Sequence, residues 1–278
     1  MIAFAVCMVI MIGAVGCSKP TNRDVVATEE PHSNPTEEIP SATLDIKKDY
    51  RVLFIGNSFT ENNNMPKGIF APLCKKAGYN VIVDQVTKGS YILESFANSA
   101  DTYGAKIDSY LKKYKYDMVI LQEQSHRPIT NFGSFKRGVR ALSEKIKENG
   151  AEVYLYETWG YKKGHGSLAS YGGSTKAMAK KLHDAYISVA DSVEAKVIYA
   201  GMAMLDVYTN HASSVEIYNT TDLYHPSVAG STLIAYTIFS TLFSEDVRNV
   251  SYRFGKAERD NILKQAAYNA AIEKSFVV

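Results

Sequence analysis

Residues 51–60 have the sequence RVLFIGNSFT, and the interpretation of the whole chain starts from them. The unbroken apolar run at 52–55 predicts a strand buried on both faces, as in parallel sheets. Gly56 and Asn57 favour a tight turn, so Ser58 is expected at the edge of the sheet. A serine placed there lies close to helix N-terminal amides that are able to stabilise an oxyanion. The same residues also make an ordinary turn or N-cap, so this stretch alone leaves its role open.

Four further apolar runs alternate with amphipathic stretches. The predicted strands cover residues 51–56, 80–86, 116–122, 151–157 and 195–201, and the predicted helices cover residues 66–77, 91–114, 134–149, 174–192, 227–243 and 256–274. Strict alternation of this kind predicts an α/β fold, a three-layer α/β/α sandwich around a central, mostly parallel five-stranded sheet. Ligands of such sheets bind beyond the carboxyl ends of the strands, so the residues that follow each strand are candidates for a site.

The first 48 residues are expected to lie outside the folded domain. Residues 1–16 are almost wholly apolar and uncharged, and they are shorter than the roughly twenty residues of a membrane-spanning helix, which is typical of a secretion signal. The small residues before Cys17 resemble a bacterial lipobox, in which the cysteine becomes lipidated. An ordinary signal peptide with an incidental cysteine is the alternative. Residues 17–48 are rich in proline and poor in large apolar side chains, so we expect a flexible tether before one domain over residues 49–278.

Composition argues against several other classes of protein. The formal net charge is only +2 and no block of basic residues occurs, so nucleic acid is not an expected partner. Once the signal is removed and Cys17 is lipidated, Cys74 is the one cysteine left, and its helical spacing predicts a buried small hydrophobic residue. His32, His183 and His211 lack the spacing of metal ligands, so we expect neither a metal nor a cofactor.

A second motif stands near the end of the chain. Residues 222–226 have the sequence DLYHP and precede a predicted helix. A serine hydroxyl needs a base that works near neutral pH, which the imidazole of His225 supplies. The imidazole in turn needs an orienting carboxylate, and Asp222 lies three residues earlier on the same turn. Taken alone, this spacing is also typical of a turn that caps a helix.

Together, GNSF after the first strand and DxxHP before a C-terminal helix resemble the SGNH, or GDSL, hydrolase superfamily over about residues 50–243. The resemblance implies a flavodoxin-like sandwich and a catalytic triad of Ser58, His225 and Asp222. It also implies an oxyanion hole made of the Ser58 amide, the amide of Gly89 after the second strand, and a side-chain amide after the third.

The third oxyanion element departs from the Gly-x-Asn-Asp block that is usual in the superfamily. Residues 121–125 have the sequence LQEQS directly after the third strand, and they resemble the Gln-Gly-Glu-Ser block of sialate and xylan acetylesterases. A glutamine also donates an amide N–H, so Gln122 is the expected donor and Gln124 the second choice. The combination of GNSFT, LQEQS and DxxHPS resembles bacterial lipoproteins of this superfamily.

Further residues at the strand ends are candidates for substrate binding. Trp159 follows the fourth strand, where an indole is able to stack on a sugar ring, although core packing is an equal alternative. Asn57, beside the nucleophile, is a second candidate. His126 follows the third strand and either faces the cleft or lies in an exposed loop. The glycine-rich residues 160–173 are expected to form a mobile loop over the site or a plain surface loop.

These expectations combine into an exported serine esterase. We expect two-step acyl transfer through Ser58, with O-acetyl groups on carbohydrate as the foremost substrates. Lipid on Cys17 would hold the enzyme at a bacterial membrane, in the periplasm or on the surface of the cell envelope. A catalytically weak, glycan-binding lipoprotein is the alternative from another class, and a long-chain lipase is a third. Hydrolysis of p-nitrophenyl acetate that persists after Ser58→Ala would favour the binding protein.

Overall fold

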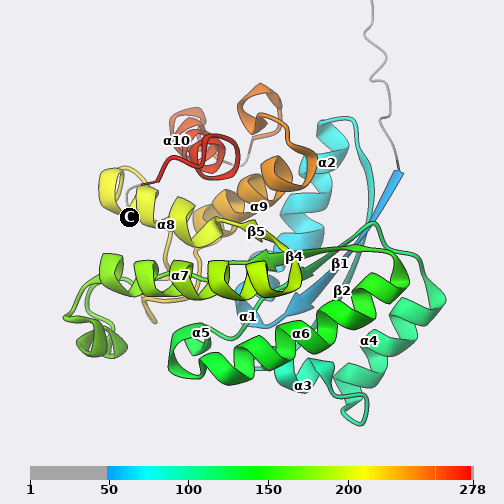
Figure 1. Cartoon of the computed structure of the whole chain (residues 1–278). Coiled ribbons are helices and arrows are strands. Elements are labelled where there is room, and N and C mark those ends of the chain that lie inside the picture. The colour runs from blue at the N-terminus through cyan, green and yellow to red at the C-terminus, as the bar shows by residue number, and fades with distance from the viewer. Residues whose placement is uncertain (1–48, 254, 277–278) are drawn as a thin grey trace, which may run out of the picture. The chain divides into compact units, whose positions relative to one another are not determined.

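The computed structural model describes residues 49–253 and 255–276, and it contains a parallel sheet between two layers of helices (Figure 1). The strands are β1 (Asp49–Gly56), β2 (Asn80–Thr87), β3 (Met118–Leu121), β4 (Glu152–Tyr156) and β5 (Lys196–Ile198). Their order is β2-β1-β3-β4-β5, and every neighbouring pair in it is parallel. The predicted three-layer α/β/α fold is confirmed.

The predicted signal peptide over residues 1–16, the lipidation site Cys17 and the tether over residues 17–48 lie outside the described residues. These three features therefore stay predictions. Within residues 49–253 and 255–276, none of the helices has the length and apolar character that crossing a membrane requires.

Two large hydrophobic cores form, one on each face of the sheet, because side chains of a strand alternate between its faces. In β1, Val52 and Phe54 enter one core while Leu53 and Ile55 enter the other, and all four are fully buried. The first core is covered by α2 (Ala71–Lys76), α8 (Ala200–Asn210), α9 (Val228–Phe243) and α10 (Ala257–Tyr268), and the second by α3 (Leu93–Ala97), α4 (Thr102–Lys113) and α6 (Phe132–Asn149). The long α7 (Thr175–Val193) contributes to both cores. Cys74 of α2 is fully buried, as predicted.

Shorter helical turns connect these elements. They are α1 (Ser58–Glu61), α5 (Arg127–Thr130), the 3-10 turns η1 (Asn62–Asn64), η3 (Gly166–Tyr171) and η4 (Val247–Asn249), and the π-helical turns η2 (Met65–Phe70) and η5 (Asn269–Glu273). The predicted helices at 66–77 and 256–274 thus each divide into a π-helical turn and an α-helix.

Two helix predictions were wrong. The helix expected over 91–114 is interrupted before Asp101, whose carboxylate caps α4 by accepting from the N–H groups of Tyr103 and Gly104. The second error is α8, which was not predicted and which begins where the fifth strand was expected to continue. Its first six residues are all buried, so the segment lacks the polar face from which an amphipathic helix is recognised.

Candidate active site

Three chain segments leave adjacent strands at one edge of the sheet. The register pairs Gly56 of β1 with Thr87 of β2, and Ile55 of β1 with Leu121 of β3. The residues that follow β1, β2 and β3 therefore start side by side beyond the carboxyl ends of the strands. This is where parallel sheets bind their ligands.

Ser58 is the first residue of α1, directly beyond β1. Asn57 caps this helix, because its Oδ1 accepts from the Phe59 N–H at 3.2 Å. Gly56 is required at the turn, since a Cβ there would lie 2.5 Å from Thr60 Oγ1 and 2.7 Å from Oε1 of Gln122, which follows β3. Within the described part of the chain, the Ser58 N–H has no acceptor, so it is available to an oxyanion.

A distant segment brings an imidazole and a carboxylate to Ser58. His225 Nε2 lies 2.8 Å from Ser58 Oγ, and His225 Nδ1 lies 2.9 Å from Asp222 Oδ2. Asp222 Oδ1 accepts from the backbone N–H groups of Tyr224 and His225 at 3.0 and 2.9 Å. Burial acts to raise the pKa of Asp222, but these N–H groups and the His225 ring outweigh it and hold the pKa below its ordinary value. The structure therefore brings the three predicted triad residues together, with the carboxylate ionised.

Trp159 lies beneath this segment rather than on the surface. It is fully buried and stacks on Phe59 with the ring centroids 4.3 Å apart. Its Nε1 donates to the carbonyl of Tyr224 at 2.9 Å. The prediction that Trp159 binds substrate is wrong because the indole has no exposed surface. It packs in the core, as the alternative held, and it fixes the backbone next to His225.

Residues 160–173 lie against the segment that carries the imidazole. The Lys162 N–H donates to the Leu223 carbonyl at 2.9 Å, and the Tyr218 hydroxyl donates to the Gly160 carbonyl at 2.6 Å. The loop therefore neighbours the site, and its hydrogen bonds hold it in this position.

Gln122 does not offer its amide to the site as predicted. It is fully buried, and its Oε1 accepts from the Asn57 N–H at 3.0 Å and from Thr60 Oγ1 at 2.8 Å. Its Nε2 donates to Asn57 Oδ1 at 3.0 Å and to the Glu123 carbonyl. Because both N–H bonds are used inside the protein, Gln122 supports the turn that carries Ser58 instead. Asn57 is 1% exposed, so its predicted contact with substrate is wrong as well.

Two further predicted oxyanion donors are not used within the part of the chain that the structure describes: the side-chain amide of Gln124 and the backbone N–H of Gly89. The Gln124 side chain is half-buried, and among the described residues its amide has no hydrogen-bond partner. Gly89 is exposed just beyond β2, and its N–H has no acceptor in residues 49–253 and 255–276. Both are available to an oxyanion, and their role as its donors stays a prediction.

Left-handed backbone conformations occur in the loops after β2 and β3 and in the segment that carries His225. Ser90 has φ 61° next to Gly89, Ser125 has φ 43° after Gln124, and Leu223 has φ 65° after the triad aspartate. Such conformations cost on the order of 1–3 kcal/mol each in a non-glycine residue, and they concentrate at functional sites. No sequence signal announced this strain, since serine and leucine are not typical of left-handed positions.

An aromatic wall, formed by Tyr224, His165, Tyr161 and His126, packs beside His225, with Tyr161 buried behind Tyr224. The Tyr224 ring centroid lies 4.1 Å from that of His225 and 5.4 Å from those of Tyr161 and His165. His126 Nδ1 lies 2.7 Å from the Tyr161 hydroxyl. Burial, together with the nearby His165, lowers the pKa of His126, so that ring is mostly neutral at pH 7. Of the two interpretations of His126, the structure favours a half-buried position beside the site.

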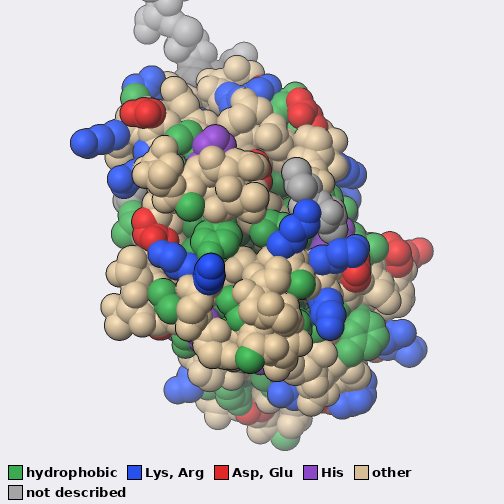
Figure 2. All heavy atoms as spheres, turned by 90° about the vertical axis from the view of Figure 1, so that its left-hand side faces the viewer, with side chains coloured by type: hydrophobic (Ala, Val, Ile, Leu, Met, Phe, Trp, Pro, Cys, Tyr) green, Lys and Arg blue, Asp and Glu red, His purple; other side chains and the backbone are tan. Residues whose placement is uncertain are grey.

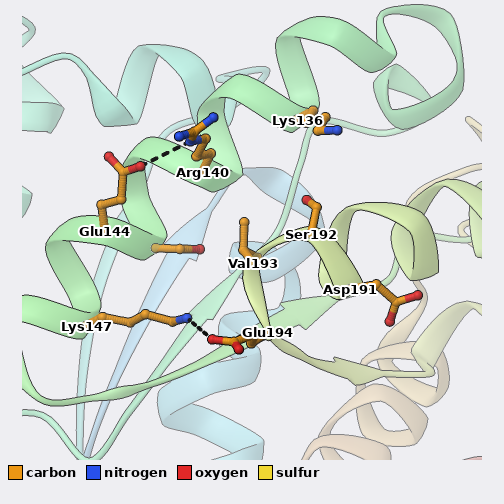
Figure 3. A pocket seen from close by; sticks show the side chains of 9 residues that line it. Lys136, Arg140, Glu144, Lys147, Asp191, Ser192, Val193 and Glu194 are labelled. Atoms are coloured by element: carbon orange, nitrogen blue, oxygen red, sulfur yellow. Dashed lines mark hydrogen bonds and ion pairs between the residues drawn. The ribbon is translucent and has the colours of Figure 1, made fainter.

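Charged surface features lie elsewhere. A groove of about 600 Å³ runs between α6 and the C-terminal end of α7 (Figure 3), and no triad residue lines it. Its side chains pair with one another, Arg140 with Glu144 at 3.1 Å and Lys147 with Glu194 at 3.0 Å. On the face shown in Figure 2, basic side chains are spread out rather than gathered in one patch. The hydrogen-bonding groups at the sheet edge, and not the size of a cavity, therefore locate the site.

No protein-family model and no curated protein matches the chain, but solved structures do. A protein assigned as an SGNH hydrolase from Slackia heliotrinireducens is 30% identical with a TM-score of 0.60, and the match covers 70% of this chain and 100% of that one. A DUF4886 family protein from Bacteroides uniformis ATCC 8492 is 21% identical with a TM-score of 0.72, over 83% and 98% of the two chains. TesA is 15% identical with a TM-score of 0.50, over 69% and 97%. The last two show the fold alone. Because the match at 30% identity covers the full length of the Slackia protein, this chain belongs to the SGNH/GDSL hydrolase superfamily.

Proposed function

We propose that the chain is a serine esterase that hydrolyses small acyl esters, O-acetyl groups on carbohydrate above all. One observation carries the proposal: an unbroken line of hydrogen bonds runs from the Asp222 carboxylate through the His225 ring to the Ser58 hydroxyl. This arrangement has the nucleophile, the base and the orienting group of acyl transfer, each within hydrogen-bond distance of the next.

The contacts define the role of each group. Because the ionised Asp222 accepts the proton of His225 Nδ1, the nitrogen that faces Ser58 is the basic one. It takes the Ser58 proton while the serine oxygen attacks the ester carbonyl, and it then gives that proton to the leaving alcohol. The backbone N–H groups of Ser58 and Gly89 and the side-chain amide of Gln124 bind the oxyanion. Water, activated by His225 in the same way, releases the acid from the acyl-enzyme.

The aromatic wall supports a carbohydrate as the alcohol part of the substrate. The half-buried Tyr224 ring next to His225 has an apolar face against which a sugar ring is able to pack. His165 Nδ1 accepts from the Ser167 N–H at 3.1 Å, so its other nitrogen holds the proton when the ring is neutral and is a donor to a hydroxyl. Because His126 is mostly neutral, it adds no charge to the aromatic wall, which suits an uncharged sugar. The likeness of LQEQS to the block of sialate and xylan acetylesterases supports acetyl as the acyl group.

A serine-directed phosphonate tests the nucleophile. A fluorophosphonate probe is expected to add to the full chain at one equivalent and to shift the mass of the peptide that contains Ser58. Labelling should be nearly abolished in His225→Ala, because the hydroxyl then lacks its base. The same preparations are assayed with p-nitrophenyl acetate, butyrate and octanoate and with acetylated sugars, and acetate is expected to be released fastest.

The outcomes separate the parts of the proposal. Labelling at Ser58 without acetate release from any acetylated sugar would retain the esterase and overturn the carbohydrate substrate. A preference for octanoate would favour a lipase. An unlabelled Ser58 would contradict the enzyme itself and favour a glycan-binding protein.

We further propose that lipid on Cys17 anchors the esterase to a bacterial membrane, which would give it glycans of the cell envelope as substrates. The small residues before this cysteine support the proposal. Expression of the full chain in a bacterial host is expected to place it in the membrane fraction, and Cys17→Ser to move it out of that fraction. Equal fractionation of the two forms would argue for an ordinary signal peptide.

A further inference from the structure

Glu123 is a buried carboxylate at the site that the proposed mechanism does not use. It is fully buried, and its Oε1 accepts from the Gln124 N–H at 2.6 Å. Both of its oxygens also lie 3.4 Å from the N–H of Leu93, the first residue of α3. Because α3 follows the loop that carries Gly89, one carboxylate joins the two loops on either side of Ser58.

The helix at the far end of this link is itself firmly held. Gly138 of α6 packs so closely on α3 that a Cβ there would lie 2.5 Å from Glu94 N and 2.7 Å from the carbonyl carbon of Leu93. Glu94 adds two hydrogen bonds to side chains of α6. Glu123 therefore ties the backbone of Gln124 to a helix whose position is fixed independently.

We infer that Glu123 is a positioning residue for the oxyanion hole, which fixes Gln124 relative to Gly89 and Ser58. The inference rests on the proposed function. Glu123 acts through Gln124, whose side-chain amide has no partner among the described residues and whose neighbour Ser125 has a left-handed backbone at φ 43°. A strained loop persists only where its surroundings hold it, and the carboxylate supplies that support.

A buried carboxylate is an unfavourable choice for a purely structural link. Burial raises the pKa of Glu123 to about 7. The groups that face it are Gln124 N of its own loop, Leu93 N and Glu94 of α3, Arg127 of α5 and Tyr186 of α7. The folded state holds the Glu123 proton up to a higher pH than the unfolded chain does. The contribution of Glu123 to the free energy of unfolding is therefore present below its ordinary pKa and is lost as the pH rises toward 7. A residue that weakens the fold near neutral pH is typical of a functional requirement.

A double-mutant cycle at positions 123 and 124 of the full chain tests the inference, with p-nitrophenyl acetate as substrate. Gln124→Ala is expected to lower kcat about 100-fold, the effect of losing one oxyanion donor. Glu123→Gln should lower kcat about tenfold with KM nearly unchanged, because the misplaced donor acts mainly in the transition state. In the Gln124→Ala background, the same change should cost less than about twofold. A tenfold loss in both backgrounds, or an unchanged kcat in Glu123→Gln, would overturn the inference.

The pH profile gives a readout that a structural role would not change. An ionised carboxylate is the stronger acceptor, so the advantage of the wild type over Glu123→Gln should shrink from about tenfold near pH 8 to about twofold near pH 5.5. If Glu123→Gln does not fold, the wild type is compared with Gln124→Ala instead. Since Glu123 acts through Gln124, kcat of the wild type should fall more steeply below pH 7, and parallel profiles would overturn the inference.

Glu157→Gln is the matched control. Glu157 is also fully buried directly after a strand, but its carboxylate binds His183 at 2.8 Å and the Met202 N–H at 3.2 Å in α8. The kcat of Glu157→Gln should stay within about twofold of the wild type, because none of these contacts reaches Gln124 or the triad. Loss of activity in Ser58→Ala with normal kcat in Glu123→Gln would overturn this inference alone. Wild-type activity in Ser58→Ala would overturn the proposed function as well.

Discussion

Replacing Ser58 with alanine is expected to lower kcat/KM for p-nitrophenyl acetate by about 10⁴-fold, which corresponds to about 5.5 kcal/mol of transition-state stabilisation. The hydroxyl that lies 2.8 Å from His225 Nε2 is lost, and with it the covalent step. The backbone N–H at position 58 and the other oxyanion donors remain. A residual rate above that of uncatalysed hydrolysis is therefore expected, because these groups still stabilise attack by water.

The control for this change is Ser251→Ala. Ser251 is an exposed serine in a loop after η4, so its rate should match that of the wild type. Thermal unfolding of both variants should occur close to the wild-type temperature, because Asn57 still caps α1. A rate in Ser58→Ala within about tenfold of the wild type would show that hydrolysis does not pass through an acyl-serine.

The sheet could be predicted because β1, β3 and β4 are short apolar runs, and a parallel sheet buries both faces of its inner strands. Two features of the helices that cover the sheet could not be predicted, the break between α3 and α4 and the presence of α8. The pattern of residues 91–114 continues through the break between α3 and α4, which is set by a close contact: a Cβ on Gly104 would lie 2.0 Å from the Asn98 carbonyl oxygen. Helices α7, α9 and α10 all pack against α8 and bury several of its sides, so its own sequence has no polar face from which a helix could be recognised.

The triad could be predicted because its members lie in two short motifs whose places follow from the topology. The orientation of Gln122 could not, since a side chain after a strand faces whichever neighbour leaves room for it. Here Gly56 leaves that room, and the Gln122 amide fills it and binds Asn57. The only trace of this contact in the sequence is a glycine at the end of β1 and a long polar residue just after β3, and the two are recognised as neighbours only once the strand order is known. For Trp159 there was none, because an indole after a strand suits a core and a surface equally well.

Asp222→Asn is expected to lower kcat/KM by about 10⁴-fold while the fold stays intact, and the cause is the tautomer of His225. Asp222 Oδ1 accepts two backbone N–H bonds, from Tyr224 and His225. An asparagine keeps its carbonyl oxygen at that place and so turns its NH₂ group toward His225 Nδ1. The ring then accepts at Nδ1 and holds its proton on Nε2, where it faces the Ser58 oxygen and is unable to take a proton from it.

Nitrogen chemical shifts of the His225 ring separate this cause from a loss of structure. In the wild type the proton is expected on Nδ1, and in Asp222→Asn on Nε2. Asp222→Ala is the comparison: it leaves two backbone N–H groups without their acceptor beside the left-handed Leu223, so it should lower the unfolding temperature, which the asparagine variant should not. If Asp222→Asn shows the altered tautomer and yet turns over at the wild-type rate, then His225 is not the base that activates Ser58, and the proton must leave the serine by another route.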